Sequence, residues 1–159
     1  MATQRYVILI LLIKLKECYE FSPEDYPLHI SLVSSFQIKD TSDQLLKKII
    51  QCCTDVNAFT VTAGEDEFFG PNKEVHVTTI VKDDRLQLLH LNLVAVLSKA
   101  GAIFDEPDYM LENYRAHATV QQTDRLHTGD LVAINNISII DKLPNGNSNM
   151  RKIVKIIHL

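Results

Sequence analysis

Three of the six histidines have a hydroxyl residue two positions later, in His29-Ile-Ser31, His76-Val-Thr78 and His117-Ala-Thr119. Residues i and i+2 of a β-strand project from the same face, about 6.6 Å apart along the strand. A strand with this pattern therefore directs an imidazole and a hydroxyl into the same space. Two such strands facing each other would surround one small tetrahedral group with two imidazoles and two hydroxyls.

This set of groups suits cleavage of a phosphodiester, or the reverse reaction. A neutral imidazole can take the proton of the attacking oxygen while a protonated one gives a proton to the leaving oxygen. The unperturbed histidine pKa of about 6.5 allows both forms near neutral pH. The hydroxyls can donate hydrogen bonds to the non-bridging oxygens, where negative charge gathers in the transition state. The chemistry needs neither a metal nor a cofactor, and we expect none.

Alternating and helical patterns indicate the elements that would carry these residues. We expect one helix from the cap residues Thr41-Ser-Asp43 to about Val56, and another that begins at Asp83-Asp84 and stops at Gly101. Apolar and β-branched runs predict the strands, with Gly64 and the turn at residues 70–72 separating two of them. The expected strands are Tyr6–Ile13, Leu28–Phe36, Ala58–Thr62, Glu74–Val81, Arg115–Val120 and the runs Leu131–Ile140 and Ile153–Ile157.

Strands and helices do not alternate strictly, which argues against a parallel doubly wound sheet. We expect an α+β fold of mostly antiparallel sheets with outer helices. Each half of the chain carries one helix and several strands, so two similar lobes facing each other are predicted. No linker divides residues 1–159, which we take as a single domain.

The composition of the chain limits the kinds of binding partner that we expect. The 159 residues include 16 Lys and Arg against 20 Asp and Glu, a net charge of −4, which disfavours a broad grip on a long polyanion such as duplex nucleic acid. The apolar run at residues 6–13 is shorter than a membrane helix requires, and Lys14 and Lys16 follow where a signal peptide would be cleaved. Three cysteines without a zinc-like spacing fit reduced thiols. We expect a cytoplasmic monomer that does not bind membranes.

Common catalytic motifs are absent from the sequence. It has no GxxxxGK[ST] phosphate loop, no GxGxxG helix start, no HExxH and no G-x-S-x-G. No cluster of histidines and cysteines suggests a metal ion. The histidine and hydroxyl pairs are therefore the main candidates for chemistry.

His29-Ile-Ser-Leu32 and His117-Ala-Thr-Val120 together resemble the paired signatures of the two-histidine (2H) phosphoesterases, in the branch of 2′-5′ RNA ligases and cyclic phosphodiesterases. The resemblance covers most of the chain. It implies a bilobal fold with pseudo-twofold symmetry whose two motifs line a central groove. It also implies hydrolysis of a 2′,3′-cyclic or 2′-5′ phosphodiester in RNA-derived molecules, or ligation by reversal. By that likeness His29 and His117 are acid and base, and Ser31 and Thr119 bind the phosphate.

Some positions depart from the family pattern or lie outside its core. Ser31 stands where threonine is commoner, Ala116 where proline is common, and Ser34 where an aromatic residue is often found. Phe36 is the ring nearest to that position and is a candidate for substrate binding. His76 precedes the second helix, whereas the second motif should follow it, so we expect His76 to be structural. We expect His90 to be a surface or packing residue of that helix.

Two residues before His117 could also contact substrate. Arg115 shares the strand parity of His117 and Thr119 and could bind a phosphate, or it could face solvent at the start of the strand. Tyr114 could stack on a base, or it could pack in the core.

The expected substrate is an RNA terminus, a cyclic nucleotide or a short oligonucleotide. Two alternatives stay open. The enzyme could act on 2′-5′ oligoadenylate or cyclic oligonucleotide signals, or the groove could bind nucleotide phosphates without catalysis. Intact pairing of both histidines and both hydroxyls argues against the second alternative.

Overall fold

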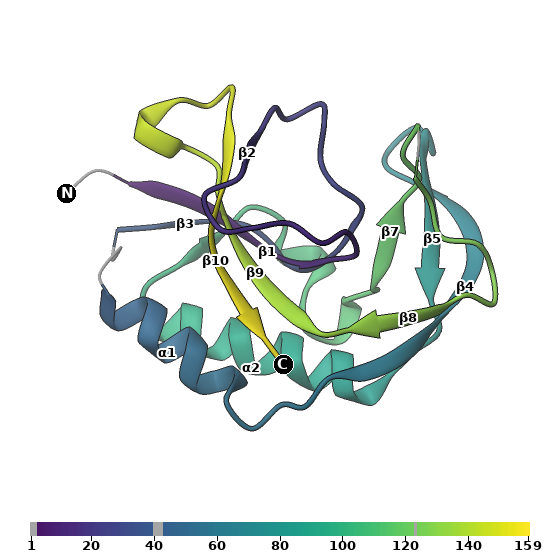
Figure 1. Cartoon of the computed structure of the whole chain (residues 1–159), viewed down its shortest axis with the longest axis horizontal. Coiled ribbons are helices and arrows are strands. Elements are labelled where there is room, and N and C mark those ends of the chain that lie inside the picture. Colours follow the sequence, from purple (N-terminus) through teal and green to yellow (C-terminus); the bar gives the residue numbers. More distant parts are fainter. Residues whose placement is uncertain (1–2, 40–42, 123) are drawn as a thin grey trace.

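The computed structural model describes residues 3–39, 43–122 and 124–159, which form two α-helices and ten strands (Figure 1). The helices are α1 (Asp43–Cys53) and α2 (Asp84–Lys99). The strands are β1 (Gln4–Leu11), β2 (Glu20–Phe21), β3 (His29–Ile38), β4 (Phe59–Phe69), β5 (Val75–Ile80), β6 (Ile103–Phe104), β7 (His117–Thr119), β8 (Leu131–Ile134), β9 (Asn136–Asp141) and β10 (Arg151–His158).

The strands form two antiparallel sheets. The large sheet has the order β2-β10-β9-β1-β3-β6, and the small sheet has the order β7-β5-β4-β8. Figure 1 shows α1 and α2 side by side beneath the large sheet, with the small sheet to the right. The predicted α+β class with antiparallel sheets and outer helices is confirmed. No helix among the described residues is long and apolar enough to cross a membrane.

Strand β1 is the centre of the large sheet, and it is buried on both faces. Ile8 and Ile10 belong to the core that the helices cover, whereas Leu9 and Leu11 belong to a second apolar cluster on the opposite face. This double burial explains why the run reads as continuously apolar instead of alternating. β3 pairs with β1 from His29 to Ile38, with shifts in register on either side of Ile8.

Helix α2 begins and ends as its sequence predicts. The Asp83 carboxylate accepts hydrogen bonds from the backbone N–H groups of Arg85 and Leu86, which completes the first turn. Gly101 follows the helix with φ of +88°, a conformation that favours glycine over other residues. Helix α1 ends at Cys53, earlier than expected, and the predicted cap residues Thr41 and Ser42 lie outside the described residues.

Two strand predictions were wrong in their limits. Gly64 does not end a strand, because β4 continues through it to Phe69 with a shift in register against β5 between Ala63 and Asp66. A Cβ at Gly64 would lie 2.9 Å from Thr79 Oγ1, so glycine there permits a close approach of the two strands. The run Leu131–Ile140 is likewise two strands, since the chain leaves the small sheet at Ile134 and enters the large sheet at Asn136.

Asn136 joins the end of β1 to β9 through its side chain. Its Oδ1 accepts from Leu11 N at 3.0 Å and its Nδ2 donates to Leu11 O at 2.8 Å, so the amide replaces a strand partner. Ser138 Oγ donates to the same Oδ1. Leu11 pairs with His29 on its other side, and Asn136 therefore fixes the strand end against which β3 begins.

We predict that Asn136→Ala destabilises the fold by roughly 2–4 kcal/mol, because it leaves the buried N–H and C=O of Leu11 without their side-chain partners. Urea unfolding followed by circular dichroism measures this change. Asn149→Ala, on an exposed turn, is the control and should stay within about 0.5 kcal/mol of the unchanged protein. Equal stability of the two variants would contradict the role given to Asn136.

Candidate active site

The first motif occupies the start of β3. Ser31 lies opposite Leu9 in the antiparallel register and His29 lies opposite Leu11. Because residues directly opposite in such a pair share a face, both motif residues project from the side of the large sheet that the helices do not cover. Both are half-buried. The i, i+2 spacing therefore places the imidazole and the hydroxyl on one face, as the sequence predicts.

The second motif forms the short edge strand β7 of the small sheet. His117 lies opposite Thr79 of β5, and Thr119 lies opposite Val77. Both motif residues are half-buried, whereas Ala118 between them is buried on the other face. The second pair thus has the same local geometry as the first.

Strands β3 and β7 belong to different sheets, yet they lie against each other. The Tyr114 hydroxyl, just before β7, donates to the Ser31 carbonyl of β3 at 2.8 Å. The two imidazoles are also close enough that the charge of His117 lowers the pKa of His29. The fold therefore brings together two motifs that are far apart in the sequence.

The two histidines are held by the same kind of hydrogen bond. His29 Nδ1 lies 2.6 Å from the carbonyl oxygen of Pro27, and His117 Nδ1 lies 2.8 Å from that of Arg115. In each case the acceptor is the carbonyl two residues earlier. Because a carbonyl only accepts, Nδ1 carries the proton and Nε2 is the nitrogen left to exchange one.

Burial lowers the pKa of both histidines below the ordinary value. For His29 burial is the main cause, the hydrogen bond to Pro27 opposes it, and the charge of His117 adds to it. For His117 burial is again the main cause; the Arg115 carbonyl and Glu106 raise the pKa, and the Arg115 charge lowers it. Both groups are thus poised to be neutral near pH 7, and each takes a proton more readily when an anion lies beside it.

One aromatic ring lies against each histidine. Tyr26 lies 5.3 Å from His29 between ring centroids, and Phe69 meets His117 edge to face at 4.7 Å. Tyr26 comes from the loop between β2 and β3, and Phe69 is the last residue of β4. Neither ring can be predicted from the sequence, because no spacing along the chain relates it to the motifs.

The three further candidates from the sequence differ in their surroundings. Arg115 is exposed; its guanidinium lies over the Phe69 ring and forms an ion pair with Glu67 at 2.6 Å. This places it beside the second motif. Phe36 is only 1% exposed and packs against Tyr6 and Phe104 in the helix-covered core. Its burial leaves almost no surface for a substrate and argues against the predicted contact.

Tyr114 and His90 form a strut, a pair of stacked rings that links the two motifs. The Tyr114 ring stacks on His90 with 4.0 Å between centroids, while its hydroxyl reaches Ser31. His90 is 1% exposed and spans the same gap, since Nδ1 donates to Leu32 O of β3 and Nε2 accepts from Leu111 N. Burial raises the pKa of the Tyr114 phenol and lowers that of His90. These contacts indicate that Tyr114 positions β3 against the segment leading into β7.

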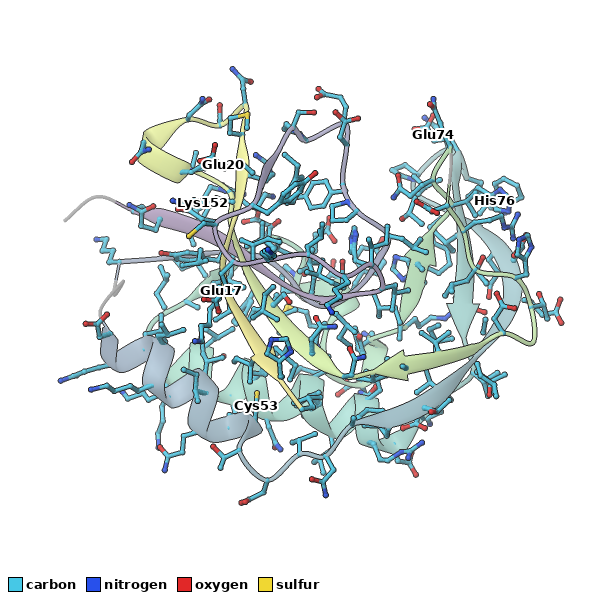
Figure 2. The ribbon with its side chains drawn as sticks, viewed as in Figure 1. Glu17, Glu20, Cys53, Glu74, His76 and Lys152 are labelled. Atoms are coloured by element: carbon cyan, nitrogen blue, oxygen red, sulfur yellow. The ribbon has the colours of Figure 1, made fainter. Side chains whose placement is uncertain are left out.

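The His76 side chain points away from the second motif, at the outer side of the small sheet (Figure 2), because its neighbour Val77 is the residue that lies opposite Thr119. The His76 carbonyl oxygen accepts from Val120 N at 3.0 Å. The His76 ring stacks on Phe68, and its Nε2 lies 2.9 Å from an Asp66 oxygen. Hydrogen bonds from Arg125, His76 and Thr78 lower the pKa of Asp66 to about 2. His76 is therefore engaged in an ionic cluster with its own partners.

Two hollows border the motif strands without being lined by either histidine. One, of about 660 Å³, is lined by Ala116 and Thr79 beside the second motif. The other, of about 770 Å³, is lined by Leu11 and Leu28 beside the first. Within the described ranges, no three His, Cys, Asp or Glu side chains gather in an arrangement that could hold a metal ion.

Comparison with known proteins agrees with this geometry. Residues 13–134 match the family model described as the 2′-5′ RNA ligase superfamily, a match that includes both motifs and most of the chain. The chain belongs to the 2′-5′ RNA ligase superfamily. The resemblance to two-histidine phosphoesterases seen in the sequence is thereby confirmed. No curated protein matches the sequence.

Three solved structures share the fold of this chain. A crystal structure of a phosphoesterase aligns with a TM-score of 0.58 at 13% identity, over 99% of each chain. E. coli LigT complexed with 3′-AMP gives a TM-score of 0.57 at 13% identity, also over 99% of each chain. LigT complexed with NADP+ gives 0.58 at 12% identity, over 100% of this chain and 99% of that one. The two-sheet arrangement is therefore common to chains with little sequence in common.

We predict that Tyr114→Phe lowers the free energy of unfolding by about 1 kcal/mol, since the ring can still stack on His90 while Ser31 O loses a hydrogen bond. Urea unfolding measures the loss. Tyr109→Phe removes a hydroxyl from a side chain that is exposed and should change little. A loss as large in Tyr109→Phe as in Tyr114→Phe would show that the bond to Ser31 is not its source.

Proposed function

We propose that this protein is a metal-independent phosphodiesterase that uses His29 and His117 as its acid–base pair. The substrate class is a 2′,3′-cyclic or 2′-5′ phosphodiester of an RNA-derived molecule, and ligation is the reverse reaction. Membership of the 2′-5′ RNA ligase superfamily supports a phosphoesterase activity in general. Nucleotides bound to LigT structures are consistent with a nucleotide substrate.

One observation carries this proposal. Both histidines stand on adjacent strands of opposite sheets, and each uses Nδ1 to bind the carbonyl two residues earlier. This shared anchoring leaves two Nε2 atoms as proton donors or acceptors, each with a hydroxyl residue on the same strand face. A pair of histidines with purely structural roles would not require the same orientation twice.

In hydrolysis of a 2′,3′-cyclic phosphate, the neutral imidazole takes a proton from water as the water oxygen bonds to phosphorus. The bond from phosphorus to one ribose oxygen breaks, and the protonated imidazole gives that oxygen its proton. Ser31 and Thr119 donate hydrogen bonds to the non-bridging oxygens, whose negative charge grows in the transition state. The product is a phosphate monoester, and the two histidines end in exchanged protonation states.

The fold supplies the orientation that this reaction needs. The Pro27 and Arg115 carbonyls fix the ring tautomers, and the strut of His90 and Tyr114 holds the segment before β7 against β3. Partial burial of both histidines reduces the screening of a phosphate by water, so hydrogen bonds to it become stronger.

We predict that His29→Ala and His117→Ala each lower kcat by about 10²- to 10⁴-fold, the usual contribution of a positioned acid or base. Ser31→Ala and Thr119→Ala should each cost about 10- to 10³-fold, because each removes one donor to the transition state. Steady-state hydrolysis of a nucleoside 2′,3′-cyclic phosphate and of a 2′-5′ dinucleotide measures these losses.

His76→Ala is the matched control, since it removes another His-x-Thr histidine that lies in the Asp66 cluster. Its kcat should stay within several-fold of the unchanged protein when circular dichroism shows a native fold. Loss of activity in His76→Ala but not in His29→Ala would overturn the assignment. Tight nucleotide binding without turnover of either substrate would instead indicate a non-catalytic binding module.

We also predict a bell-shaped dependence of kcat/KM on pH, with its maximum below the ordinary histidine pKa of about 6.5. Both pKa values are lowered in the free enzyme, so activity falls on the alkaline side once the acid has lost its proton. On the acidic side it falls as the base becomes protonated, and the apparent values belong to the pair.

A pH series of initial rates, run with and without excess EDTA, measures this profile. Activity should be insensitive to chelation. A kcat/KM that rises steadily above pH 8, or activity that is lost to EDTA and restored by one divalent ion, would contradict the two-histidine mechanism.

A further inference from the structure

Three cationic side chains gather on the large sheet beyond the first motif. Arg5 lies near the start of β1, Lys142 follows the end of β9, and Arg151 begins β10. Hydrogen bonds join them, because the backbone Lys142 N donates to Arg5 O and the side-chain Nη1 of Arg151 donates to Lys142 O. The proposed acid–base chemistry does not use this cluster.

Arg151 is connected to His29 through a single ring. Its Nε donates to the Tyr26 hydroxyl at 2.9 Å, and its guanidinium carbon lies 6.0 Å from the centre of that ring. The same Tyr26 ring lies 5.3 Å from His29. One nitrogen of the guanidinium, Nη1, is held by three backbone carbonyls, of Lys142, Ser148 and Met150. Arg151 is therefore a fixed cation beside the first motif.

Lys142 faces the same side of the sheet as the motif. Its Nζ donates to Ser35 Oγ of β3. Asp141 lies opposite Tyr6, which packs against the helix-covered core, so the next residue, Lys142, points to the other face of the sheet, where His29 and Ser31 lie. Ser35 follows Ser31 by four residues, at most about 13 Å along the strand. A short oligonucleotide is therefore long enough to reach from the proposed phosphate position to Lys142.

The Lys142 side chain has no close carboxylate among the described residues. Asp105 forms an ion pair with Arg5, and no carboxylate oxygen within residues 3–39, 43–122 and 124–159 lies within ion-pair distance of Lys142 Nζ. Burial, with Arg151 and Arg5 nearby, lowers the pKa of Lys142, while Asp105 and Glu106 raise it. Glu106 also raises the pKa of His117, so the cluster and the second motif share one electrostatic neighbourhood.

We propose that Lys142 and Arg151 form an anion subsite that binds a second phosphate of the substrate, beyond the phosphodiester held between the two histidines. The inference rests on the proposed function for the identity of the first phosphate position. A half-buried lysine near two arginines is stabilised by a bound anion, because the added negative charge favours the ammonium form. The Lys142 ammonium is a point charge, and the Arg151 guanidinium keeps Nη2 as a donor while Nε and Nη1 are engaged, so both suit phosphate oxygens.

This subsite would select among RNA-derived substrates. A nucleoside 2′,3′-cyclic phosphate carries one phosphate and leaves the cluster empty. Either a 5′-phosphate on the same nucleoside or the next phosphodiester of a dinucleotide would supply the second phosphate. The preferred substrates are therefore nucleotides with at least two phosphate groups, and not nucleosides whose only phosphate is the 2′,3′-cyclic one.

The first test measures equilibrium binding, which does not require turnover. Isothermal titration calorimetry compares 3′-AMP with adenosine 3′,5′-bisphosphate. The unchanged protein should bind the bisphosphate about tenfold or more tightly, the scale of a hydrogen bond between charged groups. In Lys142→Met this preference should fall to about twofold or less, because methionine keeps the apolar stem and removes the charge.

Lys152→Met is the matched control. Lys152 is the next residue of β10 after Arg151 and lies opposite Glu20 of β2; both are labelled in Figure 2. Successive strand residues point to opposite faces, so this variant loses the same charge on the other side of the sheet. It should keep the preference for the bisphosphate. Equal affinities for the two nucleotides in the unchanged protein, or an equal loss of preference in both variants, would overturn the subsite.

A second measurement identifies the source of the phosphate. Values of kcat/KM are compared for a nucleoside 2′,3′-cyclic phosphate, its 5′-phosphorylated form and a dinucleotide ending in the cyclic phosphate. Lys142→Met should reduce the advantage of whichever second phosphate the subsite binds. If no cyclic phosphate is hydrolysed while the binding preference persists, the proposed function fails and the subsite stands; hydrolysis with no preference in either assay overturns the subsite alone.

Discussion

The site depends on one hydrogen bond that occurs twice. An imidazole can act as a directed acid or base only when one nitrogen is fixed, and in this protein a backbone carbonyl two residues upstream fixes Nδ1 of both His29 and His117. That bond requires the chain before each strand to turn its carbonyl back toward the ring. The burial of β1 on both faces and the Asn136 amide hold the strand end against which the first turn is formed.

Much of each motif could be predicted from the sequence because strand geometry is local. The spacing of His29 to Ser31 and of His117 to Thr119 is sufficient to put each pair on one face. The helix caps at Asp83 and Gly101 are local signals as well, and α2 follows them. The prediction that Gly64 ends a strand was wrong for a physical reason. Glycine allows close backbone approach within a strand as readily as it allows a turn, and spacing alone does not distinguish the two.

The sequence by itself could not show which strands meet. β3 and β7 come together through a strut whose members, His90 and Tyr114, have no motif of their own and whose partners lie far along the chain. The rings of Tyr26 and Phe69 and the cations Lys142 and Arg151 were missed for the same reason. Phe36 was predicted from its place after the motif, but its side chain lies buried in the helix-covered core, which argues against contact with a substrate.

The buried, neutral imidazoles tie folding to proton concentration. Burial lowers the pKa of His29, His90 and His117 in the folded chain, while the unfolded chain keeps values near 6.5. Below that pH the unfolded state binds more protons, so stability is lost as the pH falls from about 6.5 through the lower folded values. One member of the proposed catalytic pair must nevertheless be protonated to act. Acid therefore supplies the proton that one member of the pair needs while it weakens the fold, and a bound phosphate counters the weakening because its negative charge favours the imidazolium form.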